Sequence, residues 1–262
     1  MEIKDGTKLN TIGKAIAVME AIQSARRPLS IKAIADALEI NKSSLHHHIK
    51  TLTEHGYLQQ DPESRKYDIG LGLVRVGQAY LQRLNVRERG HGHLEALSRA
   101  LNQTVHMLVL DGAEAVYVDK VDVHHQPGAL QCSSFIGLRT DVYSTASGKV
   151  LLSHLEQGAQ QSILASLDIR PITQHTLRDA NALAEELVRV KQQGYGLDLQ
   201  EHSLGLQCIA VPVLNHHSQC VAAISVSCPL ATVSREQLET DVLSALAETG
   251  RRISIAMGYI AP

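Results

Sequence analysis

Two short amphipathic segments joined by a tight connection constrain the fold of this chain most strongly. In the second segment Leu45, Ile49 and Leu52 recur at helical spacing, so one face is apolar and the opposite face is polar. Asn41 precedes it as a residue suited to cap a first helical turn. Residues 31–38 form the other segment and end shortly before Asn41. Taken alone, the polar face suits solvent as well as DNA, but the pairing predicts a helix-turn-helix, whose second helix enters the major groove.

A β-hairpin is predicted directly after this pair. Residues 57–60 and 65–69 are expected as strands on either side of the turn signal Asp61-Pro62-Glu63-Ser64. Arg65 and Lys66 fall near the tip of the hairpin, where they are placed to contact phosphates, which position a protein without reading sequence. Ordinary surface charge is the alternative role for these two side chains. A hairpin in this position would form the wing of a winged helix-turn-helix.

The charge is divided unevenly along the chain. Residues 1–89 carry 14 Lys and Arg against 10 Asp and Glu, a net of +4, and residues 90–262 carry 11 against 17, a net of −6, which together give −2. A length of 262 residues indicates two domains. A basic first part beside an acidic second part suits a small nucleic-acid-binding module joined to another domain.

The sequence argues against a membrane or secreted protein. No apolar run approaches the ~20 residues needed to cross a bilayer, and the polar start at residues 1–5 is unlike a secretory signal. The cysteines show no CxxC spacing and are expected as reduced thiols, mostly buried. They are Cys132, Cys208, Cys220 and Cys228. We therefore expect a cytoplasmic protein.

Motifs for enzymatic chemistry are missing from the sequence. Gly148-Lys149 lacks the glycine that a phosphate-binding loop needs five residues earlier, where Tyr143 stands. Adjacent histidines at 46–48 point about 100° apart on a helix, so they cannot converge on one metal ion. We predict no catalytic activity, no cofactor and no metal. A metal-assisted hydrolase and a pure protein-interaction module are the alternatives.

Alternating patterns in the second half predict an α/β domain built on an antiparallel sheet. Two strand pairs are expected, residues 104–110 with 115–119 around an Asp-Gly turn, and residues 208–214 with 220–227. Helices are expected near 145–156, 179–193 and 234–257. Before this domain, residues 73–84 carry an apolar helical stripe, and the simplest partner for it is the same helix of another subunit. The expected assembly is a dimer, with a tetramer as the alternative.

Several motifs spread over nearly the whole chain resemble those of the IclR family of bacterial transcription regulators. They are residues 28–46 and 54–58 in the first half, and Val116–Val121, Thr145–Leu152, Gly194–Gly196 and Gly205–Val213 in the second. The resemblance implies an α+β protein with a winged helix-turn-helix at 1–70, a linker helix at 71–91 and a GAF-like effector-binding domain at 92–262. His47 departs from the family pattern, which has arginine there, and His48 replaces an apolar residue.

The resemblance implies two sets of functional residues. For double-stranded operator DNA they are Lys42, Ser43, Ser44, His46, His47, Lys50, Arg65 and Lys66. For a small-molecule effector they are Ala129, Cys132, Thr140, Ala146, Ser147, Asp198, Leu206, Cys208, Ser225 and Ser227. The family leans to repressors of neighbouring catabolic operons, and an activator of the same architecture remains the alternative.

Local chemistry suggests what the effector pocket would accept. Ser225 and Ser227 share one face of a strand, and the free N–H groups at a helix start near Ala146 and Ser147 favour a carboxylate. Asp198 would accept hydrogen bonds from hydroxyls, so the expected ligand is a small hydroxy- or oxo-acid. The tail at residues 253–259 is similar to members that sense sugar acids. Ordinary structural roles remain the alternative: hydroxyls bonded to nearby backbone, and Asp198 capping a turn.

Overall fold

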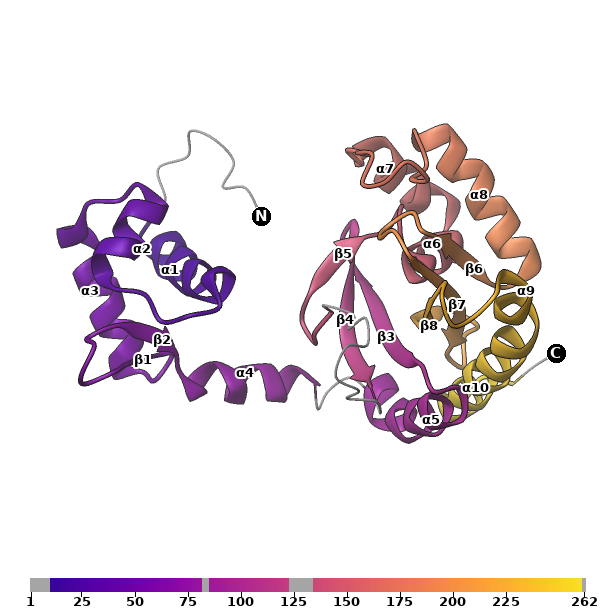
Figure 1. The fold of residues 1–262 in the computed structure, drawn as a ribbon, viewed down its shortest axis with the longest axis horizontal. Helices are drawn as coiled ribbons and strands as arrows, with labels where there is room; N and C mark the ends of the chain where they lie inside the picture. The colour runs from indigo at the N-terminus through magenta and orange to yellow at the C-terminus, as the bar shows by residue number, and fades with distance from the viewer. Residues whose placement is uncertain (1–9, 82–84, 123–133, 261–262) are drawn as a thin grey trace. The chain divides into compact units, whose positions relative to one another are not determined.

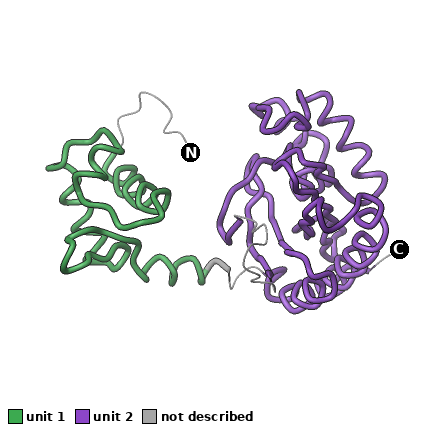
Figure 2. Tube along the Cα trace, viewed as in Figure 1, with its two compact units in different colours: residues 1–83 green, residues 84–262 purple. Residues whose placement is uncertain are grey.

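The chain folds into two compact units, Met1–Arg83 and Leu84–Pro262 (Figure 2). The computed structural model describes residues 10–81, 85–122 and 134–260. Each unit has its own hydrophobic core and is described by itself. In the described ranges, no helix has the length and apolarity needed to cross a lipid bilayer.

The first unit is a winged helix-turn-helix (Figure 1). Its elements are α1 (Thr11–Ala25), α2 (Ile31–Leu38), α3 (Lys42–Glu54), β1 (Leu58–Gln60), β2 (Tyr67–Ile69) and α4 (Leu71–Leu81). The predicted apolar stripe of α3 is buried, with Leu45 and Ile49 at 0% and 1% exposure, against Ile22 of α1 and Ile34 of α2. The two strands pair antiparallel, and Leu29 adds a bridge to Tyr67. The predicted helix pair and hairpin are confirmed.

Each of the first three helices begins at a polar residue that satisfies a free N–H group. Asn10 accepts from the backbone N–H of Gly13, and Ser30 accepts from that of Ala33. Asn41 accepts from the N–H of Ser43 at 3.0 Å, as its sequence position predicts. These short helices gain definition from their caps, because intrinsic propensity alone does not hold a helix of eight to fifteen residues in water.

The predicted linker helix at 71–91 differs from the observed structure. Helix α4 ends at Leu81, and a separate helix, α5 (Asn85–Leu101), belongs to the second unit. Val86 and Leu94 are buried, and Gly90 lies so close to Met107 that a Cβ there would meet the methionine methyl at 2.4 Å. Residues 85–91 are therefore anchored in the core of the second unit, which begins earlier in the chain than the predicted residue 92.

The second unit is a curled sheet with helices on both faces (Figure 1). The strands are β3 (Thr104–Asp111), β4 (Glu114–Val121), β5 (Arg139–Asp141), β6 (Gly196–Leu199), β7 (Leu206–Leu214) and β8 (Cys220–Pro229). Their order is β5-β4-β3-β8-β7-β6, and every neighbouring pair is antiparallel. The two predicted strand pairs and the α+β class are confirmed; β5 and β6 were not predicted.

The helices divide between the two faces of the sheet. On one face lie α5 and α10 (Leu243–Ala256), the latter continuous with α9 (Arg235–Gln237) and a π-helical segment (Leu238–Val242). On the other face lie α6 (Ala146–Ser153) and, behind it, α8 (Ala180–Gln193), with α7 (Gln157–Ser166) packed against α8. Because side chains alternate along a strand, the sheet buries an apolar set under α5 and α10 and presents a different set to α6.

Candidate functional site

Polar residues occupy the sheet face below α6. In one row across three strands, Asp198 on β6 pairs with Cys208 on β7, which pairs with Ser227 on β8. Two residues along, Ser225 pairs with His106 on β3. Residues in register point to the same face, and so do residues two apart. Hydroxyl, thiol, carboxyl and imidazole groups therefore lie together on one face of the sheet, which is called the floor below.

The start of α6 lies over this floor. Thr145 caps the helix: its hydroxyl accepts from the N–H of Gly148 at 3.2 Å and donates to the carbonyl of Asp141 at 2.8 Å. The N–H groups of Ala146 and Ser147 precede that bond and have no acceptor within the helix. Gly148 allows this placement, because a Cβ there would lie 2.4 Å from the Cα of Val142. The positive end of the helix dipole thus faces the floor.

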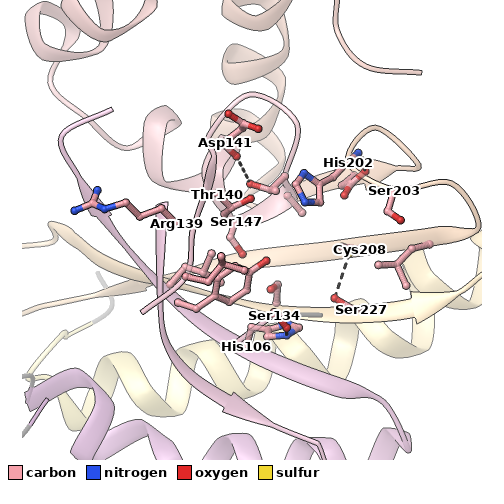
Figure 3. A pocket seen from close by; sticks show the side chains of 18 residues that line it. His106, Ser134, Arg139, Thr140, Asp141, Ser147, His202, Ser203, Cys208 and Ser227 are labelled. Carbon is pink, nitrogen blue, oxygen red and sulfur yellow. Dashed lines mark hydrogen bonds between the residues drawn. The ribbon is translucent and has the colours of Figure 1, made fainter. Parts of the chain in front are cut away.

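Floor and helix enclose a cavity of about 330 Å³ (Figure 3). Its described lining comprises His106, Leu108, Tyr117, Ser134, Leu138, Arg139, Thr140, Asp141, Thr145, Ala146, Ser147, Asp198, His202, Ser203, Leu206, Cys208, Ser225 and Ser227. Cys208 and Ser227 are in hydrogen-bond contact at 3.2 Å, as drawn in Figure 3. Within the described residues, the buried hydroxyl of Thr140 has no hydrogen-bond partner. A buried unpaired hydroxyl is costly, which makes it a natural contact for a polar ligand.

The structure brings together eight of the ten predicted effector residues around this cavity. They are Thr140, Ala146, Ser147, Asp198, Leu206, Cys208, Ser225 and Ser227. Ala129 and Cys132 lie outside the described residues. The prediction did not include His106, Tyr117, Ser134, His202 or Ser203. His106 lies inside the strand that was predicted at residues 104–110, and no local signal in the sequence marks its side chain as part of a site.

Asp198 has two roles in the local structure. Its side chain is 3% exposed, and its Oδ1 accepts from the backbone N–H groups of Glu201 at 2.7 Å and His202 at 3.3 Å. It therefore caps the turn that follows β6, the alternative considered from sequence, and it also lines the cavity. Burial raises the pKa of Asp198 to about 7, and the nearby Glu201 carboxylate acts in the same direction. Near neutral pH this carboxyl can both accept and donate a hydrogen bond.

Few positive charges face the cavity. Among its described lining residues the one Lys or Arg is Arg139, and its guanidinium pairs with Asp111 and Glu114 instead. Figure 3 shows the Arg139 side chain extending away from His202, Ser203 and Cys208. Burial lowers the pKa of His106 to about 3 and also lowers that of His202, so both imidazoles are neutral at physiological pH. An anionic group in the cavity would depend on the N–H groups of α6, as the sequence suggested.

The predicted DNA-contacting residues form the outer surface of α3 and the wing. Ser43, His46, His47 and Lys50 are exposed, as are Lys42 and the hairpin residues Arg65 and Lys66. Ser44 is half-buried and accepts from the ammonium group of Lys14 at 3.2 Å, which draws a further cation to the start of the recognition helix. His48, which stands where the family has an apolar residue, is also half-buried, and burial together with nearby Lys14 lowers its pKa.

Comparison with known proteins identifies both units. Residues 11–62 match the IclR helix-turn-helix domain, and residues 78–255 match the C-terminal domain of the bacterial transcriptional regulator IclR. The chain belongs to the IclR family. Members of this family are DNA-binding transcriptional regulators rather than enzymes. The family resemblance drawn from the sequence motifs is confirmed.

Several IclR-family relatives align over almost their full length. The chain is 34% identical to the transcriptional regulator XynR of Escherichia coli over 253 residues, covering 96% of this chain and 98% of XynR. It is 32% identical to KdgR of Escherichia coli over 256 residues, covering 98% and 95%. The crystal structure of the Thermotoga maritima IclR superposes with a TM-score of 0.80 at 29% identity, over 96% of this chain and 100% of that one.

A buried ion pair lies behind the cavity of this IclR-family domain and supports its wall. Lys149 of α6 is 1% exposed, and its ammonium group contacts Glu201 Oε1 at 2.5 Å, the Leu197 carbonyl at 2.8 Å and Glu186 of α8 at 3.9 Å. Burial raises the pKa of Glu201, while Lys149 opposes that shift. Glu201 directly precedes the lining residues His202 and Ser203. The contact between Lys149 and Glu201 therefore holds the turn after β6 against α6.

Proposed function

We propose that this IclR-family regulator is a repressor of a catabolic operon and that a small hydroxy-, oxo- or sugar acid modulates its operator binding. The observation that carries the proposal is the start of α6, where two N–H groups without helical acceptors lie over the polar floor of the cavity. An activator with the same architecture is the alternative for the sign of regulation.

The groups around the cavity suit an acid that carries hydroxyl or carbonyl oxygens. The carboxylate lies at the N–H groups of Ala146 and Ser147, where the helix dipole favours negative charge. The unpaired hydroxyl of Thr140 is a second donor for the same group. A ligand hydroxyl is directed to Asp198, and Ser225 and Ser227 remain for further oxygens. An apolar ligand would leave these polar groups without partners, at a cost for each.

Operator recognition is assigned to α3 and the wing. The exposed residues Ser43, His46, His47 and Lys50 would meet base edges and phosphates in the major groove, and the exposed Arg65 and Lys66 would meet the adjacent backbone. Lys42 and Ser44 lie at the helix start, where N–H groups and Lys14 attract a phosphate. Lys50 also lies 3.7 Å from Glu54, an exposed pair that is weak enough to exchange for a phosphate.

A second copy of the chain is the proposed partner of the first unit. A groove of about 390 Å³ lies among α1, α3 and α4, with Ile16, Met19, Leu52, Tyr57 and Leu73 in its lining. Ile12 and Val76 also line the groove and are 69% and 52% exposed, so a large apolar surface faces water. A two-fold dimer would cover it and match two operator half-sites. Analytical ultracentrifugation separates monomer, dimer and tetramer, and Val76→Asp should shift the protein toward monomer.

The function is tested with the full chain and a fluorescent DNA fragment from upstream of its own gene. Anisotropy measures DNA affinity with and without a panel of hydroxy-, oxo- and sugar acids, and thermal unfolding measures binding of each acid. We expect at least one acid to raise the melting temperature and change DNA affinity, and a reporter fusion to show increased expression on deletion of the gene. If no acid in the panel changes either the melting temperature or the DNA affinity, the proposal of an acid effector is refuted. Reduced expression of the reporter on deletion of the gene would establish an activator.

A further inference from the structure

The apolar groove of the first unit contains two histidines of the recognition helix. The groove of about 390 Å³ among α1, α3 and α4 is lined on the α3 side by His47 and His48, beside Leu52. Among its described lining residues none is Asp, Glu, Lys or Arg, and most of the rest are aliphatic. Histidine is the side chain whose charge ordinarily changes between about pH 5 and pH 8. The two histidines are therefore the described lining groups that respond to pH in this range.

We propose that His48 links the pairing of two copies of the first unit through this groove to the release of a proton, so that the pairing weakens in acid. The inference rests on the proposed function, which supplies the second copy as the occupant of the groove. The lack of charge in the described lining suits that occupant. A two-fold interface brings the same surface patch of each copy together, and like charges in that patch would repel each other.

His48 enters the groove from the edge of the buried stripe of α3. It follows Leu45 by three residues and precedes Leu52 by four, so its side chain lies on the same side of the helix as both. It is half-buried, and its ring meets that of His47 edge-on with centroids 6.0 Å apart. Within the described residues, neither ring nitrogen of His48 has a hydrogen-bond or ion-pair partner. Solvent in the open groove must therefore satisfy both nitrogens, and a second copy that covers the groove displaces that solvent.

The charged neighbours of His48 are cationic. Burial lowers the pKa of His48, and the like charges of Lys14 on α1 and His47 on α3 lower it further. On the side of α4, the described lining consists of Leu73 and Val76, which carry no charge. Because the facing patch is the same one, a second copy adds burial without adding a carboxylate, and it opposes the charged ring still more strongly. The pairing is therefore fully present above the pKa of His48 in the unpaired copy and is lost as pH falls through that pKa.

The two-fold arrangement doubles the effect of the proton. Each dimer covers two copies of His48, and each fully linked proton changes the dissociation constant about tenfold per pH unit, or about a hundredfold for both copies. An apolar residue, which the family resemblance leads one to expect at this position, would carry no such dependence. It would also avoid the cost of removing solvent from two ring nitrogens. The histidine thus lowers the affinity of pairing at every pH and makes this affinity sensitive to acid.

The test is sedimentation equilibrium of the full chain at pH 7.5 and pH 5.5. We expect the dissociation constant of the wild-type dimer to be at least about tenfold higher at pH 5.5. His48→Gln keeps a polar side chain without a titrating group and should reduce this ratio to less than about twofold. His48→Leu should do the same, and it should also pair more tightly than wild type at both pH values. DNA is left out, because acid would strengthen phosphate contacts of the exposed His46 and His47, which is the opposite effect.

Three further variants separate this inference from its alternatives. Val76→Asp places a charge in the groove and should remove the pairing, so the association step that this variant removes is the one to compare between pH values. His55→Gln makes the matched change at an exposed histidine of the first unit that does not line the groove, and it should keep the wild-type pH dependence. His47→Gln changes the other lining histidine, whose exposed ring keeps more of its solvent, and it should keep most of the pH dependence.

The outcomes distinguish the role of His48 from the proposed dimer. The inference fails if wild-type protein pairs equally well at both pH values, if His48→Gln keeps the full pH dependence, or if His47→Gln removes it. In each of these cases, a loss of pairing in Val76→Asp shows that the dimer through the groove stands and that only the role of His48 is refuted. If Val76→Asp leaves the association of the chain unchanged, the proposed pairing fails, and the role of His48 fails with it.

Discussion

Replacing Lys149 by methionine should destabilise the second unit by about 3–4 kcal/mol at pH 7. Lys149 is 1% exposed and is the cation that faces Glu201 at 2.5 Å. Within the described residues, Glu201 Oε2 already has no hydrogen-bond partner, so loss of the ammonium group leaves a nearly uncompensated buried carboxylate. Breaking a buried pair by removing one partner typically costs about 3–5 kcal/mol. The carboxylate of Glu186 is less affected by loss of the ammonium group, because Arg189 remains bonded to it at 2.6 Å.

An upper bound follows from the alternative open to Glu201, which is to take up a proton. An ordinary glutamate has a pKa of about 4.3, so protonation at pH 7 spans about 2.7 pH units at about 1.36 kcal/mol each, or about 3.7 kcal/mol. In the variant the pKa of Glu201 is raised in the folded state. The resulting penalty therefore exists above the unfolded pKa and fades as pH falls. At pH 5 it should shrink to about 1 kcal/mol.

Urea unfolding of the full chain, followed by circular dichroism, measures the loss of unfolding free energy in the variant at pH 7 and at pH 5. The double variant Lys149→Met/Glu201→Gln removes both charges and should unfold within about 1 kcal/mol of wild type, because a neutral pair has no charge to desolvate. A Lys149→Met protein as stable as wild type at pH 7, or a deficit that does not change with pH, would show that the pair contributes little to the fold.

Three further perturbations test other parts of the molecule. Thr145→Val removes the cap of α6 and should cost about 1–2 kcal/mol in thermal unfolding, whereas Thr145→Ser should restore most of it; equal stability of the two variants would contradict the capping role. Burial raises the pKa of Asp198 to about 7, so its stabilising contribution is present below about pH 4 and is lost as pH rises through 7. Asp198→Asn should therefore flatten the dependence of the free energy of unfolding on pH between these values. An unchanged pH dependence would refute the raised pKa. Lys66→Ala should weaken operator binding about equally for all DNA sequences and lower the slope of log affinity against log salt concentration by about one. Lys191→Ala on α8 should change neither the affinity nor this slope. If His47→Ala leaves the preference for the operator sequence unchanged, His47 has no part in reading the sequence.

The sequence predicted the elements whose determinants are local. Asn41 and the stripe Leu45, Ile49 and Leu52 define α3 without help from the rest of the chain, because a cap and a helical period lie within one segment. The pair β3 and β4 was predicted for the same reason, from alternation around Asp111-Gly112. In contrast, β5 spans three residues and β6 begins at Gly196, so each forms mainly because a neighbouring strand is present.

The candidate site was predicted where family motifs or helix starts mark it, and missed where strand register creates it. Ala146 and Ser147 could be placed from the helix that Thr145 introduces. His106 could not, because its position opposite Ser225 depends on the pairing of strands more than one hundred residues apart in the chain. Likewise, the first part of α5, residues 85–91, was assigned to the linker because the contact of Gly90 with Met107 is a tertiary one.

The start of α6 has a consequence for how ligand preference can change by mutation. Its two cavity-facing donors are main-chain groups, so exchanging the side chains of Ala146 or Ser147 leaves the N–H groups in place. Every other polar contact of the floor is a side chain that one codon change can replace. For the acid effector proposed here, divergence among descendants of such a protein is therefore unequal: the donors for its carboxylate are inherited with the backbone, whereas the side chains of β3 and β8 that would contact the rest of the molecule can change by mutation.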